Sequence, residues 1–257
     1  MSSSKRSRSG RARGGEPRQK DGRKGGTYQR SRVYFLAAGG LGLVIVLALA
    51  VVLVSGGDGK APAAKGPAGS VGQVAQSGVS PASYSSSPST GAYAKIEQRS
   101  ADAAPLTEGE AFPDAKLAVP GAELSLKGKR LDGDCGAAVW GTGVAEVLRQ
   151  GACTQAARAV YAGEEHSLTV AVFNLAGKES ADRLVGTLGS GGGFVRPLDG
   201  FGQGFSMARG LAMGHYAVVS WVQRADGKGD AQDDELLTLL IEGGKAPGPL
   251  GRAARAS

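Results

Sequence analysis

Regular alternation of apolar and polar positions is concentrated in residues 93–243. Residues 166–175 (HSLTVAVFNL) alternate with a period of two and carry apolar groups on both faces, which predicts a central β-strand. In residues 178–188, apolar residues recur at i, i+3, i+4 and i+7, which predicts a helix that stops at Gly189. The apolar positions of this helix are Ala181, Leu184, Val185 and Leu188.

The same order of elements recurs downstream. Residues 214–223 (GHYAVVSWVQ) predict another strand, and further strands are expected at 154–161 and 205–211. A polar break follows this strand, and after it the sequence predicts a helix that ends at Gly243. The apolar face of this helix is formed by Leu236, Leu237, Leu240 and Ile241. Two strand–strand–helix units result, and they represent either an internal duplication or a short chance similarity. The pattern predicts an α+β fold, a two-layer antiparallel sheet with helices on one face.

Residues 33–54 form an uncharged run of 22 residues, VYFLAAGGLGLVIVLALAVVLV. A helix of this length covers the roughly 30 Å hydrocarbon core of a bilayer, so we expect a single transmembrane helix that acts as a signal anchor. The alternatives are a buried helix of a soluble domain and a cleaved secretory signal. A cleaved secretory signal is disfavoured because the apolar run is longer than the apolar core of an ordinary signal peptide and follows a long amino-terminal segment. Ala38 and Gly42 lie four residues apart, and such small residues either pair with another helix or simply face lipid.

Charge is concentrated before this run. Residues 1–32 carry eleven Lys and Arg against Glu16 and Asp21, a net charge of +9, whereas the whole chain carries +7. Large apolar residues are absent from this tail except Tyr28, so we expect it to be disordered. A basic segment beside a transmembrane helix stays in the cytoplasm and is attracted to anionic lipid headgroups. A specific cytoplasmic partner is the alternative; nucleic acid is disfavoured because interleaved aromatic residues are missing.

Two further segments have the composition of flexible chain. Residues 55–92 are rich in Gly, Ala, Ser and Pro and predict a linker, and residues 244–257 predict a disordered C-terminal tail. The larger apolar residues of the linker are Val71, Val74, Val79 and Tyr84. The folded domain is therefore expected at 93–243, where about 150 residues suffice for one core, on the extracytoplasmic side.

The chain has two cysteines, Cys135 and Cys153, which an oxidising compartment allows to pair. We expect a disulfide between them. The apolar spacing between the two predicts a helix, which must be short or have flanks that fold back, because bridged Cα atoms lie about 4.4–6.8 Å apart. A zinc site is disfavoured because C-x-x-C spacing is missing and the only histidines are His166 and His215. We expect neither a metal nor a cofactor.

Tests for catalytic motifs give no positive result. Ser206 lies in GFSMA, which lacks the final glycine of the G-x-S-x-G motif and precedes a predicted strand. Residues 189–193 (GSGGG) are not followed by the helix or lysine that a phosphate-binding loop needs. His166 and His215 begin the two matching strands, where they serve either as catalytic or pH-sensing groups or as locally bonded strand-edge residues. The sequence thus predicts no catalytic residue and a protein that is not an enzyme.

The chain resembles single-pass membrane proteins of actinobacteria, especially streptomycetes. The resemblance rests on the frequent use of Ala, Gly and Arg, the single Asn of the chain, the basic tail, the single span and the Ser/Pro-rich linker. This resemblance covers the architecture and assigns no functional residue. The expected function is that of a membrane-anchored, non-enzymatic extracytoplasmic domain, binding or sensor-like, with an envelope protein as a further partner. The alternative is a cell-envelope enzyme with an unrecognised active site that involves His166 or His215.

Overall fold

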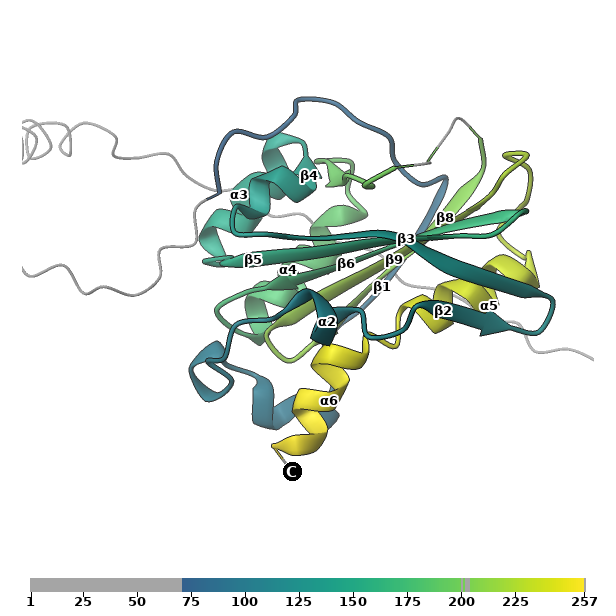
Figure 1. Ribbon diagram of the computed structural model, residues 1–257. Helices are drawn as coiled ribbons and strands as arrows, with labels where there is room; N and C mark the ends of the chain where they lie inside the picture. Colours follow the sequence, from purple (N-terminus) through teal and green to yellow (C-terminus); the bar gives the residue numbers. More distant parts are fainter. Residues whose placement is uncertain (1–70, 200, 202–203, 257) are drawn as a thin grey trace, which may run out of the picture. The chain divides into compact units, whose positions relative to one another are not determined.

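A computed structural model describes residues 71–199, 201 and 204–256 (Figure 1). They form an α+β fold around a curled mixed sheet of seven strands in the order β1-β8-β9-β6-β5-β3-β2. Neighbouring strands are antiparallel except β1 and β8, which are parallel. The strands are β1 (Ser83–Ser87), β2 (Lys116–Val119), β3 (Ala122–Asp132), β5 (Gln155–Ala162), β6 (His166–Asn174), β8 (Ser206–Met213) and β9 (Tyr216–Arg224).

Short helices and a separate two-stranded sheet complete the described part of the chain. The small sheet pairs β4 (Val139–Trp140) with β7 (Phe194–Val195) in antiparallel orientation. The α-helices are α2 (Glu108–Ala111), α3 (Thr142–Gln150), α4 (Lys178–Leu188), α5 (Asp234–Gly243) and α6 (Pro247–Arg255). The 3-10 helices are η1 (Gly91–Ile96), η2 (Arg99–Ala101) and η3 (Cys135–Ala138).

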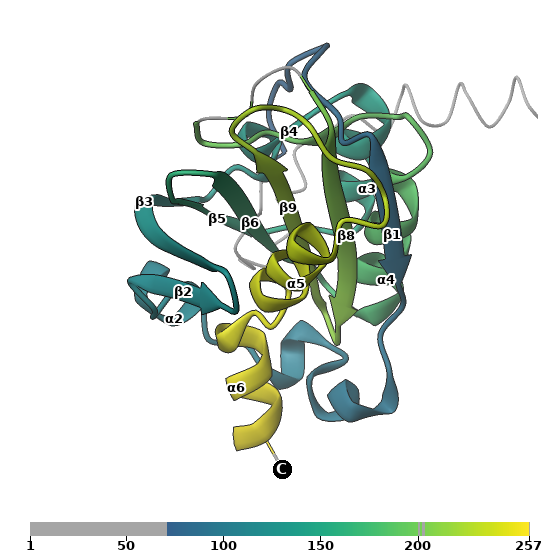
Figure 2. The same ribbon diagram turned by 90° about the vertical axis from the view of Figure 1, so that its right-hand side faces the viewer.

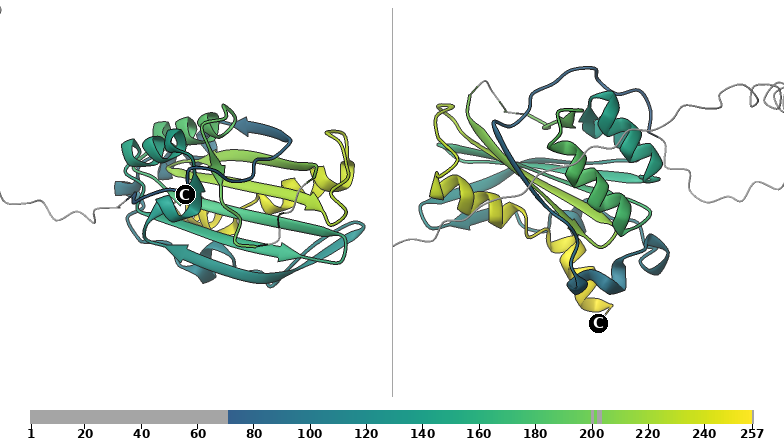
Figure 3. Two further views of the ribbon diagram at one scale, coloured as in Figure 1. Left: turned by 90° about the horizontal axis from the view of Figure 1, so that it is seen from above. Right: turned by 180° about the vertical axis from the view of Figure 1, so that it is seen from behind.

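The central strands β6 and β9 are buried on both faces, as their alternating apolar residues predict. On one face, Leu168, Val170 and Val172 of β6 pack in the same core as the leucines of α5. On the other face, Ala171 and Phe173 pack in the core that α3 and α4 cover. Helices therefore cover both faces of the sheet: α5 lies in front of it in Figure 2, and Figure 3 shows α3 and α4 along the opposite side.

This arrangement corrects the expectation of a two-layer antiparallel sheet with helices on one face. The parallel β1 makes the sheet mixed, and its sequence, SYSSS, lacks the apolar alternation that would have revealed it. The element order β5-β6-α4 and β8-β9-α5 does recur as predicted. However, Leu168 and Ala217, which are equivalent in the two similar stretches, point to opposite faces. The two units thus place their helices on opposite faces, which argues against a duplicated structural unit.

The residues that each helix buries agree with the sequence prediction in α4 and differ from it in α5. All four predicted residues of α4 are buried, and the helix spans the predicted bounds. In α5 the buried stripe is Leu236, Leu239, Leu240 and Gly243, whereas Ile241 is 54% exposed. The carboxylate of Asp233 accepts a hydrogen bond from the backbone N–H of Leu236 and so caps the amino terminus of α5.

Ordered structure extends beyond the predicted domain at both ends. Within the predicted linker, the Tyr84 hydroxyl of β1 donates to the carbonyl of Val185 at 2.6 Å. The larger apolar residues of the linker all pack against the core on the α4 side: Val71, Val74, Val79 and Tyr84. At the other end, α6 replaces the disordered tail expected at 244–257. It begins at Pro247, a residue that suits the first turn of a helix, and the buried Arg252 fixes it to the domain.

Cys135 and Cys153 form the predicted disulfide, with their Cα atoms 6.3 Å apart. The intervening helix α3 is short, nine residues, and its flanks η3 and the turn after Gln150 fold back to bring the cysteines together. The predicted transmembrane segment 33–54 and basic tail 1–32 lie outside the described residues. Within residues 71–256, as far as they are described, no helix has the length and apolarity to cross a membrane.

Candidate functional site

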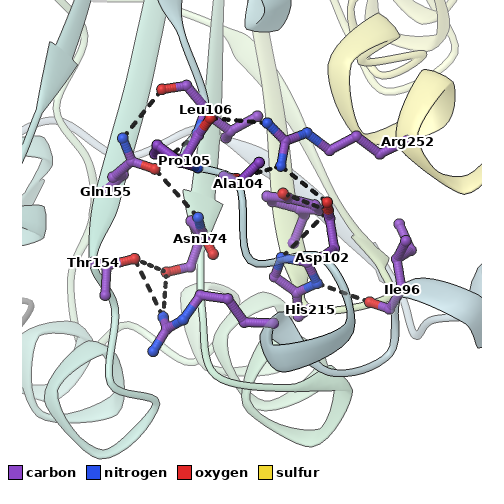
Figure 4. A network of polar contacts seen from close by, with 12 residues as sticks. Ile96, Asp102, Ala104, Pro105, Leu106, Thr154, Gln155, Asn174, His215 and Arg252 are labelled. Carbon is purple, nitrogen blue, oxygen red and sulfur yellow. Dashed lines mark hydrogen bonds and ion pairs between the residues drawn. The ribbon is translucent and has the colours of Figure 1, made fainter. Parts of the chain in front are cut away.

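Polar side chains converge at one end of the sheet, where β3 and β6 end and β5 begins. A cavity of about 810 Å³ opens there, a size within the range of small-molecule sites. Apolar and polar groups both contribute to its wall, principally Arg99, Ala103, Pro105, Thr154, Gln155 and Asn174. Figure 4 shows how Thr154, Gln155 and Asn174 lie beside the loop that carries Pro105 and Leu106. This end of the domain is the strongest candidate for a binding site.

Arg99 supplies a positive charge to the cavity. Its Nη1 donates to the carbonyls of Ala152 at 2.7 Å and Asn174 at 3.4 Å, and to the hydroxyl of Thr154 at 3.2 Å. These neutral acceptors fix the position of the guanidinium but do not neutralise it. Among the described residues no carboxylate forms an ion pair with Arg99, and partial burial lowers its pKa. The planar guanidinium fork therefore remains available to an anion.

Asn174, the only asparagine of the chain, is held in one orientation by Gln155. The Gln155 amide accepts from the backbone N–H of Leu106 at 2.9 Å and donates to its carbonyl at 3.1 Å, which fixes Oε1 as an acceptor. Asn174 must consequently present its Nδ2 to that oxygen, at 3.3 Å. Its Oδ1 is left buried without a hydrogen-bond partner, an arrangement that is rare in folded proteins and costs about 1–3 kcal/mol.

His215 lies next to this cavity, in the tight turn between β8 and β9. Gly214 precedes it with a φ of +62°, and a side chain there would collide with the Ile96 carbonyl, so the turn requires glycine. The His215 Nδ1 lies 2.8 Å from that same carbonyl, which can only accept, so Nδ1 carries the proton of the neutral ring. The Nε2 is buried without a hydrogen-bond partner, 3.8 Å from Oδ2 of Asp102.

Burial lowers the pKa of His215, and the nearby Arg99 and Arg252 add to this effect, while the Ile96 bond and Asp102 oppose it. The Asp102 carboxylate also accepts from the Tyr216 hydroxyl at 2.8 Å and pairs with Arg252 at 3.0 Å. The neutral ring is thus the form that the fold favours near neutral pH.

Arg252 ties α6 to this network, as Figure 4 shows. Its Nη2 lies 2.6 Å from Glu110 and also donates to the Pro105 carbonyl at 2.9 Å. Hydrogen bonds from Arg252 lower the pKa of Glu110. The C-terminal helix therefore fixes the loop after η2 that forms one wall of the cavity.

The structure separates the two histidines that sequence analysis grouped together. His166 begins β6 and Asn174 ends it, so His166 lies at the far end of the sheet from His215. His166 is buried beside Glu235. Ser206 starts β8, where it is buried and pairs with Gln223 of β9. No single site can use both histidines.

Sequence reasoning missed Arg99, Gln155 and Asn174. Arg99 stands in a polar loop without a motif, and Gln155 and Asn174 each lie at the boundary of a strand, where a polar residue is ordinary. The one available signal was composition: Asn174 is the single asparagine and interrupts an apolar strand at its end.

Comparisons of the chain with protein-family models, with curated proteins and with solved structures give no significant match. They therefore assign no activity, ligand or source to the fold, and the function has to be argued from the geometry of the site.

Proposed function

We propose that the protein is a membrane-anchored, non-enzymatic binding domain on the extracytoplasmic side, and that its ligand is a small carboxylate with a short apolar body. The observation that carries this proposal is the unpaired guanidinium of Arg99 in the wall of the cavity. A ligand carboxylate would form a bidentate ion pair with the fork of Arg99. Its apolar body would contact Ala103, Pro105 and Ala176.

The compartment and the anchor belong to the same proposal. The Cys135–Cys153 disulfide supports an oxidising environment, because such bonds persist outside the reducing cytoplasm. Residues 33–54 would hold the protein in the bilayer, and the basic residues of 1–32 would contact anionic lipid headgroups on the cytoplasmic side. An envelope protein that senses the liganded state is the further partner we propose.

An enzyme that uses His166 or His215 receives less support. His215 faces Asp102 at one end of the sheet and His166 faces Glu235 at the other, so neither histidine has the second one as a partner. The Nε2 of His215 is fully enclosed by the protein and so has no access to a substrate. A binding role requires only the Arg99 cavity.

Thermal unfolding of the full-length protein in detergent tests the proposal. Butyrate supplies the carboxylate and a short apolar body, and butyramide is its neutral match. We expect butyrate to raise the melting temperature in a saturable way, because a ligand that binds only the folded state stabilises it by about 2.7 kcal/mol at a concentration of 100 Kd. Butyramide should have no such effect, since it lacks the charge that pairs with Arg99.

Three variants locate the effect. Arg99→Gln should abolish the response to butyrate, whereas Arg183→Gln, which removes an exposed arginine of α4, should preserve it. Because Arg99 also bonds to backbone carbonyls, a third variant, Ala103→Phe, blocks the cavity while leaving every polar group in place. The proposed function would be contradicted if butyrate stabilised all four proteins equally. It would also be contradicted if butyrate did not stabilise the wild type.

A further inference from the structure

A second cluster of chemically competent groups lies at the other end of the sheet. Glu165 from the β5–β6 turn, His166 at the start of β6 and Glu235 in the first turn of α5 each present a ligand-type atom, and these atoms lie within 4.8 Å of one another. Three separate elements of the fold thus deliver one imidazole and two carboxylates to the same point. This group does not overlap the Arg99 cavity.

His166 supplies an independent indication that something binds here. The residue is only 3% exposed, and its Nε2 is buried without a hydrogen-bond partner. The closest carboxylate oxygen, Oε2 of Glu235, is 3.6 Å away, which is too long for a hydrogen bond. The imidazole nitrogen therefore faces a carboxylate with which it forms no hydrogen bond.

A metal ion resolves this spacing. With Zn–N and Zn–O distances of 2.0–2.2 Å, two ligand atoms of a tetrahedral zinc ion lie about 3.4 Å apart. The 3.6 Å between Nε2 of His166 and Oε2 of Glu235 is close to this value. Small movements of the exposed Glu165 side chain would bring the third ligand into the same sphere.

The local charge also favours a divalent cation. Arg224 pairs with Asp233 at 2.9 Å and with Glu235 at 2.8 Å. Together with Glu165 this gives three carboxylates and one guanidinium, a net charge of −2. Arg224 donates to Oε2 of Glu235, and a carboxylate oxygen can accept this hydrogen bond through one lone pair and bind a metal through the other. Arg224 and Asp233 thereby orient Glu235, the role that outer residues have in metal sites.

We propose that Glu165, His166 and Glu235 bind one divalent transition-metal ion, with Zn²⁺ as the best match to an imidazole and two carboxylates. Three protein ligands leave the fourth position of a tetrahedral ion open. Glu165 and His166 line a polar cavity of about 650 Å³ that also includes Glu123, Ser125 and Lys127, so water or a small polar ligand would occupy that position.

Cobalt titration of the full-length, untagged protein in detergent tests this site, after treatment with a chelator and dialysis. Co²⁺ substitutes for Zn²⁺, and its visible absorption becomes intense in tetrahedral coordination. We expect a tetrahedral spectrum that saturates at one Co²⁺ per chain and disappears on addition of Zn²⁺. The absence of saturable binding would overturn the proposal.

Variants of neighbouring residues provide the control. Glu165→Gln and His166→Gln should each weaken Co²⁺ binding by roughly tenfold or more. Glu164→Gln changes the adjacent exposed carboxylate, which lies outside the cluster, and should bind Co²⁺ as the wild type does. Because Glu165 is exposed, its replacement keeps the test valid even where His166→Gln disturbs folding. Identical affinities in all three variants and the wild type would show adventitious binding and overturn the proposal.

Discussion

Two arginines at the same end of the sheet have opposite electrostatic environments. Arg252 is surrounded by the carboxylates of Asp102 and Glu110, which raise its pKa. Among the described residues, the acceptors of Arg99 are all neutral oxygens, and burial lowers its pKa. Since Asp102 is already committed to Arg252 and Tyr216, it does not neutralise Arg99. The pairing of one arginine thus leaves the other free for a ligand.

The buried His215 makes stability depend on pH. Its pKa in the folded state lies below the ordinary value of about 6.5, so the unfolded chain binds more protons in the range between the two values. Stability is therefore lost as the pH falls below about 6.5, by at most about 1.4 kcal/mol per pH unit from this residue. Urea unfolding of the wild type between pH 7.5 and pH 5 measures this slope.

His215→Asn is the matching variant, because an asparagine amide can donate to the Ile96 carbonyl as Nδ1 does but does not titrate. It should lose less stability than the wild type over the same pH range. Identical slopes would show that His215 does not cause the acid sensitivity.

Sequence reasoning reached both histidines but not the arrangement of their partners. A histidine is visible as a candidate because its chemistry is rare in the chain, whereas Arg99 is one of many arginines and differs only by what surrounds it. The partners of His166 come from a turn and from a helix about 70 residues later, a proximity that alternation cannot predict. That no carboxylate of residues 71–199, 201 and 204–256 pairs with Arg99 becomes visible only in the folded chain.

Among the elements, α6 has an influence on the site that its sequence does not suggest. The helix PGPLGRAAR is rich in Gly, Pro and Ala and offers few apolar residues, which is why the sequence predicted a disordered tail. Its attachment is polar: Arg252 is buried, bonds to Asp102 and Glu110 and lies over the ring of Tyr216, 5.9 Å from its centroid. Hydropathy patterns do not detect an element that is held by ion pairs.

Two arginines of α6 give a matched comparison. Arg252→Ala would leave Asp102 and Glu110 without their buried cation and should lower the free energy of unfolding by about 3 kcal/mol. Arg255→Ala removes an exposed partner of Glu110 and should cost less than about 1 kcal/mol. Urea unfolding followed by tryptophan fluorescence measures both. Equal, small effects would mean that α6 is not held by Arg252.

Elements with strong alternation or helical periodicity were predictable, including β5, β6, α4, β8 and β9. The side of the sheet that each helix covers could not be predicted. The sequence of one strand–strand–helix unit does not specify the handedness of the connection between its helix and the sheet. The edge strands β1 and β2 are short and half exposed, so their pattern carries little information.

For the whole molecule, β6 connects the two proposed sites. Asn174 at its end lines the Arg99 cavity, and His166 at its start belongs to the proposed metal site, so the sites are about 26 Å apart along the strand. This strand lies in the centre of the sheet and is buried along its length. The two sites are therefore parts of one rigid scaffold, although each can be tested independently.

The disulfide links the stability of the domain to its compartment. Cys135 and Cys153 are separated by 18 residues, and a bond that closes such a loop contributes about 3 kcal/mol. Reduction should lower the free energy of unfolding by this amount, and Cys135→Ser should cost about as much as replacing both cysteines. Alkylation of protein from native membranes without reductant should label neither cysteine. Free labelling of both would contradict the bond and the extracytoplasmic location.

The most direct test of the central claim is a ¹H–¹⁵N NMR titration of the full-length protein with butyrate, observed at the Arg99 Nε–H and the Asn174 side-chain amide. We expect saturable shifts of both signals with butyrate, no shifts with butyramide, and unchanged signals from the exposed Arg183. Shifts that are absent, or that butyrate and butyramide cause equally, would contradict a carboxylate-binding site at Arg99.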